Sequence, residues 1–419
     1  MRRVGRIVTI VSVAILSNVI CVYAFPISRD DLMMSTMYFM EQKMREKSIG
    51  EAFGGYGDSL LRNFHPLFAL TQEYSDNIFF THENPSIDNI TTATPALLYK
   101  WNSSGQKTSL FLESGADFML YAKNNKYNVI NPYIEFSLQH SLRKYGFEMH
   151  YKLKKEQSTI SELQVTESKS FQDHWLNDFS AQFDIDLNRF LWNIGYSHQG
   201  NLFQKDFKNR NTNNDDSCYF ISNLKLLPKT YLYFEFEWGY LNYFRGGNLP
   251  NGTQSNVYNK YWLGINGEIT SKIKGNIKLG EAYRNYRDTG KKTVTPDIGV
   301  TLDYQATRYL TYGFKFQDHV EATGYVDEGD AKTKRWGLSS AYTPPFSTRL
   351  KLIAGASYAT SSYEDGRDNK RYDVNLTCEY QLRKWLKFQG KYSFTDNVST
   401  MSDGSYKSNI ISLGLDSEF

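Results

Sequence analysis

Apolar and polar residues alternate along most of this chain, and the alternation has a period of two. In the stretch 231–244, Leu232, Phe234, Phe236, Trp238 and Tyr240 alternate with Tyr233, Glu235, Glu237 and Gly239. Successive side chains of a β-strand point to opposite faces, whereas a helix would repeat every 3.6 residues. The pattern therefore predicts β-strands with one apolar and one polar face.

Eighteen such runs follow one another from residue 66 to the end of the chain. They span 66–80, 87–101, 107–122, 128–142, 145–158, 171–187, 190–204, 217–228, 230–244, 256–270, 273–287, 293–306, 309–321, 332–344, 347–360, 369–382, 385–398 and 407–419. One missed or invented hairpin would change the number by two, so sixteen strands is the alternative.

The connections between the runs alternate in length. Short turns are predicted at 143–144, 188–189, 228–229, 307–308, 345–346 and 383–384. Longer polar loops are predicted around 159–170, 205–217, 245–255, 322–331 and 361–368. Short turns at one rim and long loops at the other are typical of up-and-down barrels that cross membranes. The pattern lacks the helical crossovers that parallel strands need.

The length and number of the strands decide which face points inward. Strands of five or six residues are usual in soluble proteins, and a sandwich would not use so many long ones. A barrel of eighteen strands is too wide for side chains to fill. We therefore predict an all-β fold, a transmembrane antiparallel up-and-down β-barrel over residues 66–419, with its polar face inward and its apolar face toward lipid.

Inward positions carry many charged residues, which are the candidate lumen lining. They are Glu113, Asp117, Glu148, Lys152, Glu235, Glu237, Lys278, Lys315, Arg335, Lys351, Arg371, Lys387 and Lys391. On the lipid face, a Lys or Arg near the midplane would cost about 2–4 kcal/mol. The alternative is a purely structural role, in which these residues are only solvated or are paired across strands and stiffen the wall. Their signs are mixed, with no ladder that selects one ion type, and no inward run of aromatic residues suggests a path for sugars.

The N-terminus has the pattern of a secretory signal peptide over residues 1–24. Arg2, Arg3 and Arg6 precede an apolar stretch that ends at Ala24; an uncleaved membrane anchor is the alternative. Removing the signal leaves equal numbers of basic and acidic residues, so no nucleic-acid partner is expected. Residues 25–65 are expected to be a periplasmic leader with a short helix in 30–48, either a tether or a plug.

The chemistry of the chain gives little support for an enzyme. No nucleophile elbow, zinc-protease motif or phosphate-binding loop is present, so no catalytic residue, metal or cofactor is predicted. Cys218 and Cys378 both fall on the apolar face of separate strands. We predict two unpaired thiols that face lipid; a single disulfide is the alternative.

Two resemblances extend this interpretation. The final strand, ending at Phe419, resembles the C-terminal strand of outer-membrane barrels, which implies recognition by the barrel-insertion machinery. The segments EYSDNIFF (73–80) and DNITTATPAL (88–97) resemble the opening of the putative β-barrel porin type 2 family, and KYSFTDNVS (391–399) repeats the entry. The resemblance implies a bacterial outer-membrane channel for hydrophilic solutes or a secreted polysaccharide. A structural or adhesive barrel without an open pore is the alternative.

Overall fold

A computed structural model describes residues 63–103, 105, 107–159, 171–203, 212–244, 255–287, 289–322, 330–364, 366–401 and 404–418. The predicted signal peptide (1–24), the leader helix and Phe419 lie outside the described residues. Among the described residues, no helix has the length and apolar character needed to cross a membrane.

The described chain forms one sheet of eighteen antiparallel strands, which confirms the predicted number. Apart from the 3-10 turn η3 (Asn125–Tyr127), the elements are β1 (Phe64–Ser75), β2 (Asp88–Asn102), β3 (Thr108–Tyr121), β4 (Val129–Ser141), β5 (Tyr145–Thr159), β6 (Phe171–Asp186), β7 (Phe190–Phe203), β8 (Asn213–Leu227), β9 (Thr230–Tyr243), β10 (Asn256–Glu268), β11 (Ile273–Tyr286), β12 (Lys292–Thr307), β13 (Leu310–Ala322), β14 (Asp330–Tyr342), β15 (Leu350–Tyr363), β16 (Asp368–Arg383), β17 (Leu386–Ser399) and β18 (Tyr406–Glu418).

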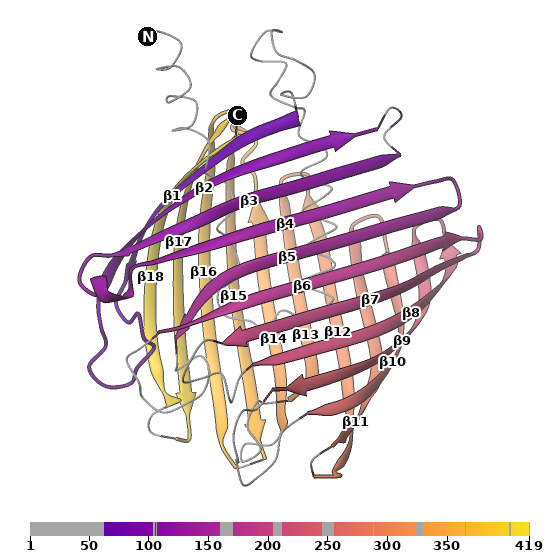
Figure 1. The fold of residues 1–419 in the computed structure, drawn as a ribbon. Coiled ribbons are helices and arrows are strands. Elements are labelled where there is room, and N and C mark those ends of the chain that lie inside the picture. Colours follow the sequence, from indigo (N-terminus) through magenta and orange to yellow (C-terminus); the bar gives the residue numbers. More distant parts are fainter. Residues whose placement is uncertain are drawn as a thin grey trace.

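The sheet closes on itself. Each strand pairs with its neighbours in sequence, and β1 pairs with both β2 and β18. The closing pair β1–β18 runs in register from Leu67 opposite Glu418 to Ser75 opposite Ile410. Figure 1 shows the result, a barrel with β2–β10 in the front wall and β11–β18 behind. A closed ring leaves no strand edge unpaired, which is the condition for a sheet to lie in lipid.

Most predicted turns and strand limits agree with the structure to within two residues, and four strand limits differ by three or more, among them the end of β15 at Tyr363 instead of residue 360. The first strand ends at Ser75 instead of residue 80, because the chain turns there; Phe80 has a φ of 51°. Strand β8 begins at Asn213, four residues before the predicted start. Strand β15 begins at Leu350, because hydrogen bonds from Ser347 N to Pro344 O (3.1 Å) and from Leu350 N to Ser347 O (3.4 Å) form a longer turn than predicted.

Candidate functional site

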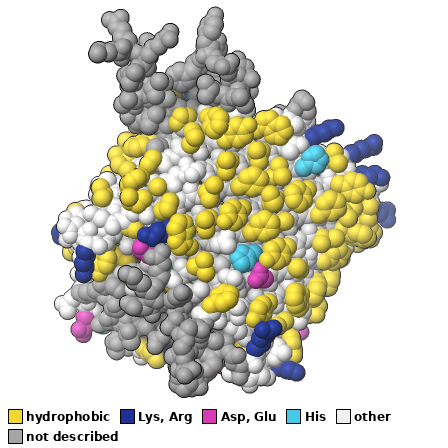
Figure 2. Space-filling model, viewed as in Figure 1, with side chains coloured by type: hydrophobic (Ala, Val, Ile, Leu, Met, Phe, Trp, Pro, Cys, Tyr) yellow, Lys and Arg dark blue, Asp and Glu magenta, His cyan; other side chains and the backbone are white. Residues whose placement is uncertain are grey.

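The two faces of the barrel wall differ sharply in exposure and chemistry. On β9, Phe234 and Trp238 are 44% and 47% exposed, whereas Glu235 and Glu237 between them are 5% and 4% exposed. The same alternation recurs along other strands, and Figure 2 shows many hydrophobic side chains on the face of the outer surface that is in view. The opposite positions line the interior, which is the candidate site. By this alternation, all the predicted lumen residues lie at inward positions.

The inward carboxylates of β3 are held by hydroxyl groups and by one lysine. Glu113 Oε1 accepts a hydrogen bond from the Tyr133 hydroxyl at 3.0 Å. Asp117 Oδ1 accepts one from Thr94 Oγ1 at 2.8 Å, and its Oδ2 lies 3.4 Å from Lys154 Nζ. Each carboxylate therefore receives a donor from a neighbouring strand, so it ties strands together as well as carrying charge.

The inward residues of β5 continue this network. Glu148 Oε1 accepts a hydrogen bond from Gln139 Nε2 at 2.7 Å. Lys152 lies in register opposite Glu135 of β4 on one side and Asp178 of β6 on the other. A lysine between two carboxylates lowers their mutual repulsion across the three strands.

A compact group of aromatic and charged side chains occupies the inner face of β8–β10. The Tyr258 hydroxyl donates to Asp215 Oδ1 at 2.8 Å and lies 3.4 Å from Glu237 Oε1. Lys260 Nζ lies 3.8 Å from Glu237 Oε2 and 4.6 Å from the centre of the Tyr258 ring. Trp262 of β10 is paired in register with Glu235 of β9. Lys278 Nζ lies over the Trp262 indole, 4.5 Å from the ring centre.

The remaining predicted residues belong to β13–β17 and are basic. Lys315 and Arg335 lie on the neighbouring strands β13 and β14, at positions two residues apart in register. Arg371 Nε lies 3.0 Å from Asp373 Oδ1, and Lys387 Nζ lies 3.1 Å from Asp416 Oδ2. Lys351 stands opposite Glu379, and Lys391 stands opposite Ser412. The wall thus brings the predicted residues into several local groups instead of one centre.

Several inward residues that complete these groups were not predicted from the sequence. Asp215 was missed because the predicted start of β8 came too late. Tyr219, Tyr233, Tyr258 and Trp262 come together on β8–β10, although no inward aromatic run was noted in the sequence. Their exposed fractions are only 3–5%, so they pack within the wall. With the correct strand limits, the alternation of inward and outward positions places all of these residues on the inner face.

Residues 63–419 match the family described as Putative beta-barrel porin 2, so the match covers every strand. The chain belongs to this family. No curated protein matches the sequence.

The porin-like barrel also resembles solved structures. Vanillate-bound OpdK from Pseudomonas aeruginosa has 8% identity and a TM-score of 0.49, with 85% of this chain and 99% of OpdK covered. OccK11 (OpdR) from the same organism has 12% identity and a TM-score of 0.48, with 85% and 96% covered. OccAB4 from Acinetobacter baumannii has 12% identity and a TM-score of 0.48, with 85% and 98% covered.

The segments that resemble this porin family have structural roles at one rim. Ile78 and Phe79 of the first segment pack with Ile90 and Tyr121 in a buried cluster. Asp88 of the second segment is fully buried and accepts hydrogen bonds from the backbone nitrogens of Lys123 and Asn124, both at 2.9 Å. These contacts fasten the loop after β1 and the loop after β3, so the segments shape the rim.

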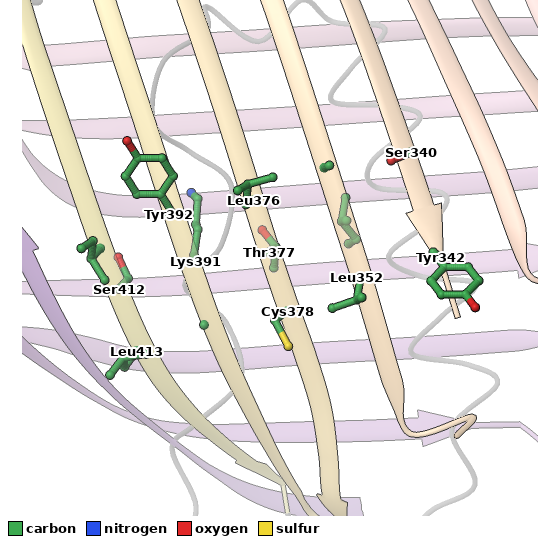
Figure 3. Close-up of a pocket in the computed structure, with 14 residues that line it drawn as sticks. Ser340, Tyr342, Leu352, Leu376, Thr377, Cys378, Lys391, Tyr392, Ser412 and Leu413 are labelled. Atoms are coloured by element: carbon green, nitrogen blue, oxygen red, sulfur yellow. The ribbon is translucent and has the colours of Figure 1, made fainter. Parts of the chain in front are cut away.

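The outer face of this porin-like barrel carries a shallow groove of about 520 Å³ over β14–β18. Figure 3 shows Leu352, Leu376, Cys378 and Tyr392 among its lining side chains. Cys378 and Cys218 are both unpaired, as predicted. No group of three or more metal-ligating side chains occurs among the described residues.

Proposed function

We propose that the chain is an outer-membrane channel of bacteria that passes hydrophilic solutes through its lumen and has no catalytic role. One observation carries this proposal, the opposite placement of exposed hydrophobic residues outside and charged residues inside a closed ring of strands. In lipid the outer face is favourable, and every backbone group can pair within the ring. The inner face requires water, because charged groups are costly to bury in apolar surroundings.

The width of the ring supports passage. Eighteen strands spaced about 4.8 Å apart and tilted by about 40° enclose a ring roughly 35 Å across between opposite backbones. Inward side chains from both walls reduce this width but do not span it. A hydrated solute can therefore pass unless another part of the chain occupies the space.

Small hydrophilic solutes fit this wall better than a polysaccharide does. Sugars bind proteins by stacking on accessible aromatic rings, but the inward rings of Tyr219, Tyr233, Tyr258 and Trp262 are almost wholly buried. Tyr219 and Tyr258 lie directly against Gly195 and Gly239, which explains how the wall covers them. Export of a polysaccharide and a purely structural or adhesive role are therefore the secondary proposals.

Planar-bilayer recording tests the channel. The chain from residue 25 onward and a form without residues 25–64 are refolded, and folding is checked by heat-modifiable gel mobility. Conductance steps from both forms would support an open pore and a leader that acts as a tether. Steps from the shortened form alone would make residues 25–64 a plug. Folded protein that is silent in both forms would contradict the channel and favour structure or adhesion.

A further inference from the structure

The charges of the inner wall are separated into two sides of the barrel. Strand register defines a row of paired inward positions across β3–β8, which contains Glu113, Glu135, Lys152, Asp178, Gln199 and Asp215. The corresponding row across β11–β16 contains Lys278, Gly299, Gln317, Arg335, Ala359 and Arg371. The first row is mainly acidic, and every charged residue of the second row is basic.

Most charged positions beside these rows continue the separation, and the exceptions on the basic side include Asp297 and Asp303 of β12 and Glu379 of β16. Asp117, Glu235 and Glu237 add carboxylates on β3 and β9, and Lys315 and Lys391 add amines on β13 and β17. Two charges of minority sign have close partners of opposite sign: Asp373 Oδ1 lies 3.0 Å from Arg371 Nε, and Lys154 is also paired. Lys154 lies 3.4 Å from both Asp117 and Glu156. Paired minority charges cancel locally, so the excess on each side remains.

The two sides meet at two seams. At β9–β10, Glu237 Oε2 lies 3.8 Å from Lys260 Nζ. At β17–β18, Lys387 Nζ lies 3.1 Å from Asp416 Oδ2. These seams place β10–β17 on one side, and β18 with β1–β9 on the other. In Figure 1 the acidic strands β3–β9 form the front wall and the basic strands β11–β17 form the back wall, across the lumen from each other.

We propose that this arrangement divides the lumen lengthwise into an anion-favouring half along β10–β17 and a cation-favouring half along β18 and β1–β9. The inference rests on the proposed channel function and deepens it. The chain then has little overall preference for either ion type, because each type has its own wall. The preferred solutes carry separate positive and negative groups, far enough apart for each group to approach the wall of opposite sign.

The screening length sets the range of this effect. Charges act over about 10 Å at 0.1 M salt and about 30 Å at 0.01 M. In a ring roughly 35 Å across between backbones, each wall controls only its own half at 0.1 M. At 0.01 M the two fields overlap across the lumen, so charge removal on either wall has a larger effect on ion selectivity.

The reversal potential in a KCl gradient tests the division. One variant of the full barrel carries Lys278→Gln, Lys315→Gln and Arg335→Gln. A second carries Glu113→Gln, Asp178→Asn and Asp215→Asn, whose amide oxygens can still accept the hydrogen bonds of Tyr133 and Tyr258. Lys370→Gln is the matched control, because Lys370 lies on β16 next to Arg371 but on the outward face.

Opposite shifts in ion selectivity are the expected result. The wild-type channel should show weak selectivity, the first variant a severalfold preference for cations, and the second a severalfold preference for anions. The shifts should grow from 0.1 M to 0.01 M salt, and the control should match the wild type. Conducting variants that keep wild-type selectivity, or that shift in the same direction, would overturn the division but leave the channel intact. Folded wild-type protein without conductance would overturn both.

A block experiment tests the solute class. The probe is a peptide of four lysines, a glycine spacer and four glutamates, compared with a peptide of the same composition whose charges alternate. The separated charges should give blockades lasting severalfold longer in the wild type, and the difference should vanish in both triple variants. Equal blockade times for the two peptides in the wild type would overturn the preference for solutes with separated charges.

Discussion

Asp76, directly after the first strand, binds Asn409 of the last strand with both of its carboxylate oxygens. Oδ1 accepts a hydrogen bond from the Asn409 backbone nitrogen, and Oδ2 accepts one from the Asn409 side-chain nitrogen, both at 2.7 Å. The two residues are 333 positions apart in the sequence. Asn77 adds a hydrogen bond from its side-chain nitrogen to the Lys407 carbonyl at 2.9 Å. These contacts join the strands at which the barrel closes.

Replacing Asp76 by alanine should weaken this closure. The substitution removes both acceptors, and hydrogen bonds to charged groups contribute about 1.5–3 kcal/mol. The free energy of unfolding of the refolded barrel should fall by about that amount, measured by urea titration in lipid vesicles. Because β1 and β18 close the ring, the folded band in heat-modifiable gels should also disappear at a lower temperature.

Asp396→Ala is the control for this prediction. Asp396 also lies near the same rim, and its Oδ2 is 3.0 Å from Lys407 Nζ, but that lysine side chain is 71% exposed. Exposed ion pairs contribute about 0–1 kcal/mol. Equal losses of stability in the two variants would show that the contacts of Asp76 are no more important than an ordinary surface pair.

The end of the first strand is a feature that the sequence pattern predicted wrongly. Alternation alone predicted eighteen strands and their faces, because one side of each strand is strongly apolar. It continued the first strand to residue 80, since Ile78 and Phe79 are good strand formers. In the structure, the Asn77 side chain donates to the Thr81 carbonyl at 2.8 Å and accepts from the Thr81 nitrogen at 3.1 Å. This local pairing replaces strand hydrogen bonds and turns the chain.

Gly239 should not tolerate a side chain. A Cβ at this inward position would overlap the ring of Tyr258, which lies across the glycine. Gly239→Ala must displace that ring and disturb its 2.8 Å hydrogen bond to Asp215. We expect a loss of about 1–3 kcal/mol in the free energy of unfolding, as for other overpacked sites, measured by urea titration.

Gly355→Ala provides a matched test on β15. Gly355 is also an inward strand glycine, but the nearest atom to its Cβ would be the Leu338 carbonyl oxygen at 3.8 Å, an ordinary contact. This variant should keep wild-type stability or gain slightly, because alanine restricts the unfolded chain more than glycine does. A loss as large as that of Gly239→Ala would show that any inward side chain is harmful.

Cys378 and its neighbour Thr377 should differ in their access to water. Cys378 shares the outward face with Leu376 and Tyr380, whereas Thr377 stands opposite Lys391 on the inner face. In vesicles, a charged maleimide should not label Cys378 in a chain with Cys218 replaced by serine. It should label Thr377→Cys in a chain that begins at residue 25 and lacks Cys218 and Cys378.

The rate of labelling is read as a gel shift with a maleimide polymer added after denaturation. Rapid labelling of Cys378 by the charged reagent in folded protein would contradict its contact with lipid. Slow labelling of Thr377→Cys would contradict a water-filled lumen at that depth. The two results therefore test the outer and inner faces separately, at adjacent residues of one strand.

The sites on the inner wall depend on register, which the sequence did not provide. Tyr258 and Asp215 are 43 positions apart and meet because β9 sets the register between β8 and β10. Alternation could place Tyr258 inward, and Asp215 as well once β8 begins at Asn213, but it could not show that the two side chains touch. The separation of acidic and basic walls likewise became visible only when the closed ring placed β3–β9 across from β11–β17.

Phe419 should matter for assembly in cells more than for the stability of the barrel. The described part of β18 ends at Glu418, whose backbone nitrogen donates to Trp385 O at 3.1 Å and whose side chain pairs with Lys100. These contacts of Glu418 join the last strand to the residue before β17 and to β2. Deleting Phe419 should therefore lower the amount of folded barrel in outer-membrane fractions severalfold and leave the yield of refolding in vesicles almost unchanged.

Phe419→Tyr is the control for this prediction. It keeps an aromatic residue at this position and should assemble normally. Equal defects in cells and in vesicles would instead make Phe419 a structural residue, and would remove the reason to assign it to the insertion machinery.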